Sequence, residues 1–283
     1  MAHALLIAAW LVTFPSSSDV KFVGSTPCDA YVRQFVGIRA GAECERISWT
    51  LSIPSREQGT FTLDVVYGMQ ANSAPGFAGG GTALQLRGAV SRIAARRPAY
   101  RLNAGGRSVV FVTLDPNLLH LLDGDGAVFL GNPGWSYTLS RSPALTPSPT
   151  MPAFQPEREA RHVAGVFEGR TPCEALEVDL GRRRNPECTK AKWRITFRDA
   201  AAGQPGEYVL EGFGYRNPPK TGTWTTLRSP LDPETVVVQL DPGNPERFLR
   251  FRFVDGRLLL FLDKHGHPLA GDEYQSYTLN KLR

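Results

Sequence analysis

Four cysteines are the residues of this chain with the greatest capacity for chemistry. Cys28 and Cys44 lie in the first half, and Cys173 and Cys188 lie at matching places in the second. Four cysteines allow three pairings, and the repetition described below selects Cys28 with Cys44 and Cys173 with Cys188. Closing a loop of this size stabilises a small domain by about 3 kcal/mol in the chain-entropy model. The alternative is four free, buried thiols in a reducing compartment.

A histidine pair is the second candidate for chemistry. His265 and His267 flank Gly266 in a predicted hairpin turn. Two imidazoles at this spacing could chelate a metal ion weakly, although copper prefers sulfur and imidazole together. The first half has Asp125 and Ala127 at the matching positions. The sequence therefore predicts no cofactor, and His265 and His267 are only weak candidates for metal ligands.

Motifs typical of enzymes are missing from the sequence. Asp123–Gly126 resembles the start of a calcium loop but lacks the glutamate that completes such a site, so we expect a tight turn. Gly79–Gly81 is followed by no Gly-Lys-Ser/Thr motif, which argues against a phosphate loop. No nucleophile stands beside a base in a recognisable pattern. We expect no catalytic residues; an exported hydrolase that uses carboxylates such as Asp123 and Asp263 is an alternative.

Charge and composition describe a globular chain. Hydrophobic residues make up 42% and charged residues 21%, values that exclude a disordered protein. The net charge of +5 comes mostly from dispersed arginines, whereas a nucleic-acid-binding face needs a concentrated basic stripe. We therefore expect no nucleic acid partner. The runs Arg96–Arg97 and Arg182–Arg184 are interpreted as solvated, with contact to anionic lipid or polysaccharide as the alternative.

The elements that position these residues are repeated. Three blocks occur in the same order in both halves, and such self-similarity is a strong signal of fold. The matching pairs are Thr26–Ala30 with Thr171–Ala175, Glu43–Ile53 with Glu187–Phe197, and Leu118–Leu139 with Leu258–Leu279.

Each copy has the pattern of short β-strands. Trp193–Phe197 alternates apolar and polar residues, Val236–Leu240 is a β-branched run, and Asp241–Pro245 is a turn signal. We predict an all-β chain of two tandem small antiparallel β-barrels of lipocalin-like type, at residues 19–141 and 163–283. A Pro-rich linker at 142–162 joins them as a semi-rigid spacer, and a ligand for a Pro-binding domain is its alternative function.

The first residues indicate export. Ala4–Val12 is an uncharged apolar run too short to anchor a protein in a bilayer, and small residues follow at Ser16–Ser18. We interpret residues 1–18 as a signal peptide, although no Lys or Arg precedes the run; a buried first strand or helix is the alternative. The expected location is the periplasm or cell envelope, with outer-membrane association left open.

Several motifs of the second half resemble a known family. They are Gly165–Cys173, Gly214–Tyr215, Thr221–Trp224, Leu262–Leu269 and Tyr277–Leu279; the first half keeps Gly81–Thr82, Leu122–Gly126 and Tyr137–Leu139, with Ala83 in place of the tryptophan. In this order they resemble the N-terminal domain of the NlpE family, bacterial envelope lipoproteins named for copper resistance and envelope-stress signalling. The resemblance implies a lipocalin-like barrel at the envelope, and function follows from it only by analogy.

Two features depart from that family. Its first cysteine opens a Cys-x-x-Cys motif suited to copper or thiol exchange, but Tyr31 and Leu176 replace the second cysteine here. Beyond the signal region, Met69 and Met151 are the only methionines, so sulfur ligands for copper are scarce. No cysteine for lipid attachment follows the apolar run.

The sequence thus favours a non-enzymatic binding or sensing module that resembles NlpE, in an envelope-stress or copper response. Its expected partners are envelope proteins or a small ligand, and membrane attachment is left open. A lipocalin-like carrier of a small apolar ligand is the alternative. An open cavity lined by Trp193, Phe197 and Phe251 would favour the carrier, whereas an interior filled with side chains would favour display of loops.

Overall fold

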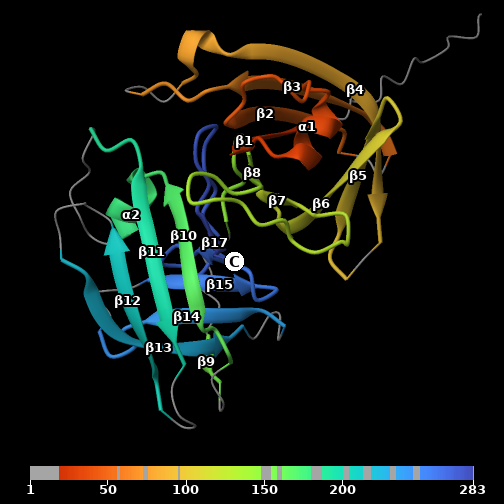
Figure 1. Ribbon diagram of the computed structural model, residues 1–283. Helices are drawn as coiled ribbons and strands as arrows, with labels where there is room; N and C mark the ends of the chain where they lie inside the picture. Colours follow the sequence, from red (N-terminus) through yellow and green to blue (C-terminus); the bar gives the residue numbers. More distant parts are fainter. Residues whose placement is uncertain are drawn as a thin grey trace, which may run out of the picture.

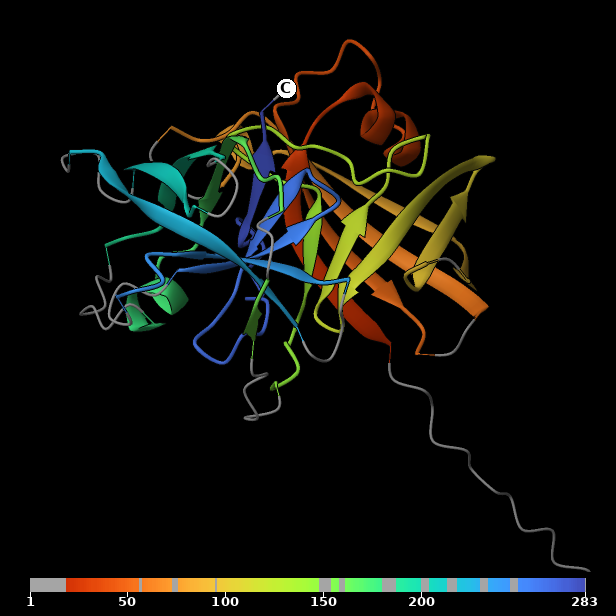
Figure 2. The same ribbon diagram turned by 90° about the horizontal axis from the view of Figure 1, so that it is seen from below.

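The chain folds into two antiparallel β-barrels that lie side by side (Figures 1 and 2). The computed structural model describes residues 19–55, 58–72, 76–94, 96–147, 154–157, 161–179, 187–199, 204–212, 218–229, 234–244 and 249–282. The predicted signal peptide at 1–18, Met151, Arg182–Arg184 and Gly214–Tyr215 lie outside these residues. Within them, each barrel has eight strands, which confirms the predicted fold class.

The first barrel is a meander in which each strand pairs with the next and the last closes on the first. Its strands are β1 (Val20–Pro27), β2 (Arg46–Ile53), β3 (Gln58–Gly68), β4 (Thr82–Ile93), β5 (Ala99–Ala104), β6 (Arg107–Asp115), β7 (Leu118–Leu121) and β8 (Thr138–Arg141). A helix, α1 (Ala30–Val36), follows β1, and a short 3-10 turn, η1 (Ala78–Gly80), precedes β4.

The second barrel repeats this order. Its strands are β10 (Gly165–Thr171), β11 (Ala191–Arg198), β12 (Gly206–Gly212), β13 (Lys220–Arg228), β14 (Val236–Leu240), β15 (Arg250–Val254), β16 (Leu258–Phe261) and β17 (Thr278–Lys281), and α2 (Glu174–Asp179) follows β10. Along β11, buried and less buried residues alternate, as the sequence predicts. A short strand, β9 (Gln155–Pro156), adds to β13 from outside.

Closure of each barrel requires a glycine where the first strand meets the last. A Cβ on Gly24 of β1 would lie 2.9 Å from Cδ2 of Leu139, and a Cβ on Gly169 of β10 would lie 2.8 Å from Cδ2 of Leu279. Real Cβ atoms are essentially never found so close to another heavy atom. The absence of a side chain at both glycines therefore lets the strands approach.

Both predicted disulfides are present. Cys28 pairs with Cys44 and Cys173 pairs with Cys188, with Cα–Cα separations of 5.8 and 6.0 Å. The pairing confirms the prediction drawn from the repeat, and no free cysteine is found among the described residues. Because disulfides persist in oxidising surroundings, the two bonds indicate an oxidising, exported location.

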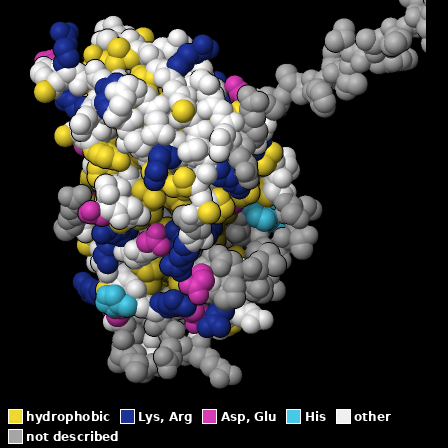
Figure 3. All heavy atoms as spheres, turned by 90° about the vertical axis from the view of Figure 1, so that its right-hand side faces the viewer, with side chains coloured by type: hydrophobic (Ala, Val, Ile, Leu, Met, Phe, Trp, Pro, Cys, Tyr) yellow, Lys and Arg dark blue, Asp and Glu magenta, His cyan; other side chains and the backbone are white. Residues whose placement is uncertain are grey.

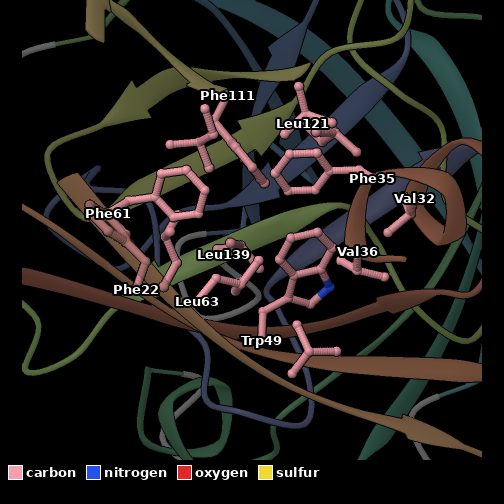
Figure 4. Packing of buried hydrophobic residues seen from close by; sticks show 14 of the residues in the cluster. Phe22, Val32, Phe35, Val36, Trp49, Phe61, Leu63, Phe111, Leu121 and Leu139 are labelled. Carbon is pink, nitrogen blue, oxygen red and sulfur yellow. The ribbon is translucent and has the colours of Figure 1, made fainter. Parts of the chain in front are cut away.

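The interior of each barrel is filled with side chains. In the first barrel, Phe35 of α1 packs over one end of the barrel toward Trp49 and Leu121, so that helix and sheet share one apolar core (Figure 4). In the second, Phe197 contacts Trp224 with ring centroids 5.7 Å apart. Trp193, Phe197 and Phe251, which would line an open cavity in a carrier, are buried members of the hydrophobic core of this barrel.

The two barrels contact each other through equivalent residues. Thr278 Oγ1 donates a hydrogen bond to Thr138 Oγ1 at 3.0 Å, and these two threonines occupy the same position in the repeat. The backbone N–H of Gly131 donates to Asn280 Oδ1, while that of Gly271 donates to Ser140 Oγ. A separate apolar cluster spans the contact, and its members are Ala99, Val112, Leu114, Leu118, Val128, Val254, Leu258 and Leu260. The contact therefore has approximate two-fold symmetry.

The linker is not a simple spacer. Phe154 packs with Leu227 and Val237 on the outside of the second barrel, next to the β9–β13 pairing. At the other end, the side chain of Asn117 accepts from and donates to the backbone of Leu145, at 2.7 and 3.0 Å. The described parts of the linker are thus attached to both barrels, which themselves touch. In the described part of the chain, no helix is both long enough and apolar enough to cross a bilayer.

Candidate functional site

A pocket of about 460 Å³ lies at the mouth of the first barrel. Strand β1 begins at this mouth with Val20 and Phe22, and it ends at α1, which covers the opposite end of the barrel. The starts and ends of β4, β5, β6 and β8 complete the wall. We call this hollow the mouth pocket, and its full lining is Val20, Phe22, Arg92, Pro98, Tyr100, Thr113, Leu114, Asp115, Pro116, Leu119 and Arg141.

The floor of the mouth pocket is apolar. Phe22, Leu114 and Leu119 are 4%, 3% and 1% exposed, so they belong to packed interiors and offer a firm surface. Tyr100 stands beside them and is half-buried. A floor of this kind attracts the apolar part of a ligand because contact removes hydrocarbon surface from water.

Two arginines face this floor. Arg141, the last residue of β8, pairs directly with Phe22, and Arg92 of β4 pairs directly with Tyr100. Directly opposed residues of an antiparallel pair point to the same side of the sheet, so both arginines extend toward the mouth pocket. Within the described residues, neither side chain forms a hydrogen bond or an ion pair. Their positive charge is thus available to a ligand.

Asp115 is the one acidic residue of the lining. Its Oδ1 accepts a hydrogen bond from the N–H of Asn117 at 2.9 Å, within the turn between β6 and β7. Burial raises the pKa of this carboxyl, and the hydrogen bond together with nearby Arg252 and His267 partly opposes the increase. The carboxyl therefore interacts with its own turn and with positive groups of the second barrel. Arg92 and Arg141 are then the dominant charges at the mouth.

The sequence candidates for metal binding belong to a hairpin turn. Asp263 Oδ1 accepts hydrogen bonds from the backbone N–H groups of His265 and His267, both at 2.8 Å. The histidines thus contribute backbone donors to the turn. In the described residues, no group of three or more His, Cys, Asp and Glu side chains is arranged to hold a metal ion.

The carboxylates considered for hydrolysis have equivalent structural positions. Asp123 Oδ1 accepts from the backbone N–H groups of Asp125 and Ala127, at 3.1 and 2.9 Å, just as Asp263 does in the second barrel. Each carboxylate therefore organises the turn of its own barrel. This arrangement supports the tight-turn interpretation of Asp123–Gly126.

One buried titratable residue was missed from the sequence. His120 is completely buried; its Nε2 lies 3.0 Å from the carbonyl oxygen of Phe129, and its Nδ1 lies 2.8 Å from Thr138 Oγ1. A carbonyl can only accept, so Nε2 carries the proton and Nδ1 accepts from the threonine. Burial lowers the pKa of His120 to about 4, so the imidazole is neutral at pH 7.

The visible surface shows no concentration of positive charge. On the face drawn in Figure 3, Lys and Arg side chains alternate with Asp and Glu, and hydrophobic side chains lie between them. Some of the positive charge is paired with carboxylates. Arg97 of the first barrel, for example, forms an ion pair with Asp255 of the second, with 2.9 Å between guanidinium nitrogen and carboxylate oxygen. This face does not have the basic stripe that nucleic acid requires.

Comparison with known proteins gives no match: no family model, curated protein or solved structure is significantly similar to the chain.

Proposed function

We propose that the chain is an exported, non-enzymatic binding protein of the bacterial envelope, and that its mouth pocket holds a small amphipathic anion. The observation that supports this most directly is the position of Arg92 and Arg141 opposite an apolar floor, where neither side chain has a hydrogen-bond or ion-pair partner among the described residues. A carboxylate or sulfonate would lie against the guanidinium groups, and its hydrocarbon part would cover Phe22 and Leu119. Arginine suits such heads because its planar donors match two oxygens.

This proposal modifies the carrier hypothesis. A carrier of the lipocalin type holds its ligand inside the barrel, whereas the described interior of each barrel holds a cluster of buried hydrophobic side chains. The mouth of the first barrel has a hollow whose volume lies in the range of about 300–1,000 Å³ typical of ligand sites. The ligand would therefore be bound at the end of the barrel.

The resemblance to NlpE supports an envelope role for this binding, in sensing or in display of loops. It supports copper handling less, because all four cysteines are in disulfide bonds and therefore cannot bind copper as thiolates. Met69, with 44% of its surface exposed, is the one described methionine. Copper coordination would have to use histidines and isolated thioether sulfur, which are weaker sets than a thiolate pair.

Calorimetric titration with dodecanoate, dodecanol and dodecyltrimethylammonium tests the proposal. We expect dodecanoate to bind at least tenfold more tightly than the other two, because only it satisfies both the floor and the arginines. Arg92→Gln and Arg141→Gln should each weaken dodecanoate about fivefold, the effect of one partly exposed charge pair.

Arg87→Gln is the matched control. Arg87 is exposed on the same strand as Arg92, but the two lie five positions apart, so Arg87 points to the other face of β4. Its loss should leave binding unchanged. Equal affinity for the three compounds, or an equal effect of Arg87→Gln and Arg92→Gln, would contradict the proposal.

A further inference from the structure

Arg46 lies in an unusual environment where the two barrels meet. It is the first residue of β2 and is 1% exposed. Its guanidinium carbon is 4.2 Å from the ring centroid of Phe77 and 5.9 Å from the centroids of both Trp135 and Tyr274. Since Tyr274 belongs to the second barrel, rings from both barrels surround this cation. We call this place the seam site.

The guanidinium of Arg46 lacks an anion. Its Nε is buried without a hydrogen-bond partner, and in the described part of the chain no carboxylate lies within ion-pair distance. Burial lowers the pKa of Arg46, with Tyr274 and Glu45 opposing the change. A buried charge without a partner is costly, and cation–π contacts offset only part of that cost.

Trp135 adds a second donor without a partner at the same place. Its Nε1 is buried and forms no hydrogen bond, although the residue is 5% exposed. Buried indole N–H groups usually find an acceptor. Two neighbouring side chains thus each have a buried donor without a partner, and one of them is cationic. A negatively charged acceptor would suit both.

Further cations gather around the seam site from the second barrel. The guanidinium carbon of Arg170 lies 5.9 Å from the Trp135 ring centroid. Burial lowers the pKa of Lys190, and the nearby charges of Arg170, Lys192 and Arg46 lower it further. These cations are thus close enough to repel one another. Arg170 is partly buried and Lys190 is exposed, so both are more accessible to solvent than Arg46.

Acidic neighbours do not neutralise this cluster. Glu45 is near both Arg46 and Lys190, but its Oε2 accepts from the backbone N–H of Gln70 at 3.0 Å. Glu273 and Asp272 are near Tyr274, and Asp272 Oδ1 accepts from two backbone N–H groups of its own loop. The carboxylates near the seam therefore have structural partners, while the guanidinium of Arg46 has none.

The repeat shows which cation of this cluster belongs to the second half alone. Arg46 and Lys190 both stand two residues after the second cysteine of their half, whereas Arg170 matches Ser25. Ser25 Oγ donates to the carbonyl oxygen of Glu273 across the same contact. The first barrel thus uses a neutral hydrogen bond where the second places a cation over an indole.

We propose that the seam site binds a small oxyanion of the phosphate class. Arg46 forms its base, Trp135 contributes a donor, and Arg170 and Lys190 form its entrance. A phosphate has enough acceptor oxygens for all of these donors, and guanidinium groups match its geometry. Because the donors come from both barrels, the ligand would also fix the barrels relative to each other. This inference is independent of the mouth pocket.

Calorimetry with inorganic phosphate, at constant ionic strength with chloride as the reference anion, tests the site. We expect saturable binding and a rise in Tm with phosphate concentration. Arg46→Met should weaken binding at least tenfold, because methionine keeps the apolar contacts with the rings but has no charge. Arg250→Met is the matched control: Arg250 also lies over a ring, that of Phe154 at 5.2 Å, on the linker side of the second barrel.

A second pair of variants covers the case in which Arg46→Met fails to fold. Arg170→Gln and Lys190→Gln change less buried residues, and each should weaken phosphate about fivefold. Absence of phosphate binding in the wild-type protein overturns the proposal. Equal binding by Arg46→Met and Arg250→Met, or unchanged binding by both Gln variants, overturns it as well.

Vesicles distinguish the two sources of the phosphate group. If the natural ligand is a lipid headgroup, phosphatidylglycerol vesicles should bind the wild-type protein, inorganic phosphate should compete, and Arg170→Gln should bind less. If it is a free phosphate, inorganic phosphate should bind while vesicles do not. Binding to vesicles without competition by phosphate would place the lipid elsewhere and contradict the seam site as its receptor.

Discussion

Acidification should destabilise the protein through His120. Its pKa falls from 6.5 in the unfolded chain to about 4 in the folded barrel because burial disfavours the imidazolium. The folded state therefore binds fewer protons than the unfolded state between these values, and stability decreases as the pH falls from 6.5 toward 4. Between pH 7 and pH 4.5 this residue alone should cost about 2.5 kcal/mol of unfolding free energy.

The substitution His120→Leu isolates this contribution. The second barrel has Leu260 at the matching position, so leucine suits the strand. Thr138 would lose the imidazole acceptor, but Ser136 Oγ lies 3.1 Å from its hydroxyl and can replace it. The variant should keep its fold and lose about 2.5 kcal/mol less than the wild type between pH 7 and pH 4.5.

Urea unfolding at the two pH values measures the difference. Carboxyl groups titrate in this interval too, but they do so equally in both proteins and cancel in the comparison. If His120→Leu lost as much stability as the wild type on acidification, protonation of His120 would not be the cause of the loss.

Two further predictions concern the first barrel and use the same urea assay. Phe35→Ala should lower its unfolding free energy by about 3–5 kcal/mol, because it empties the end of a packed core; a loss below about 1 kcal/mol would mean that α1 contributes little to that core. The double change Cys28→Ala and Cys44→Ala should cost about 3 kcal/mol in the chain-entropy model, whereas unchanged stability would contradict a structural role for the bond.

The sequence was sufficient for the architecture because repetition constrained it. Matching blocks placed the cysteines and the strands of one half onto the other, and each disulfide followed from that correspondence. Alternation in segments such as Trp193–Phe197 then identified the side of a strand that faces its own core. Both signals can be read from the chain without knowledge of which strands pair.

The contact between the barrels was not predicted, because alternation does not show whether the outer face of a strand is covered. A signal was nevertheless present in Leu118–Leu122, an apolar run interrupted only by His120. All four residues of β7 are buried, and so are those of β16. A short continuous apolar run is the pattern of a strand buried on both faces, and His120 lies on the face turned toward the second barrel.

The mouth pocket and the seam site were missed for a related reason. Arg92, Arg141, Arg46 and Arg170 are isolated in the sequence, and none belongs to a recognisable motif. Their proximity depends on barrel closure and on the packing of the barrels, which join residues more than a hundred positions apart. The linker was interpreted as a spacer because proline-rich segments are extended; composition does not reveal that Phe154 packs on a sheet.

The threonine pair at the centre of the contact has an evolutionary meaning. Patches that meet across a two-fold axis through the same residues are self-complementary, as in isologous homodimers. A chain with a single such barrel would bury the same surface by pairing with another copy of itself. Fusion of two genes would make that association intramolecular and independent of concentration, after which each copy could acquire its own charges, such as arginines at a mouth or at a shared boundary.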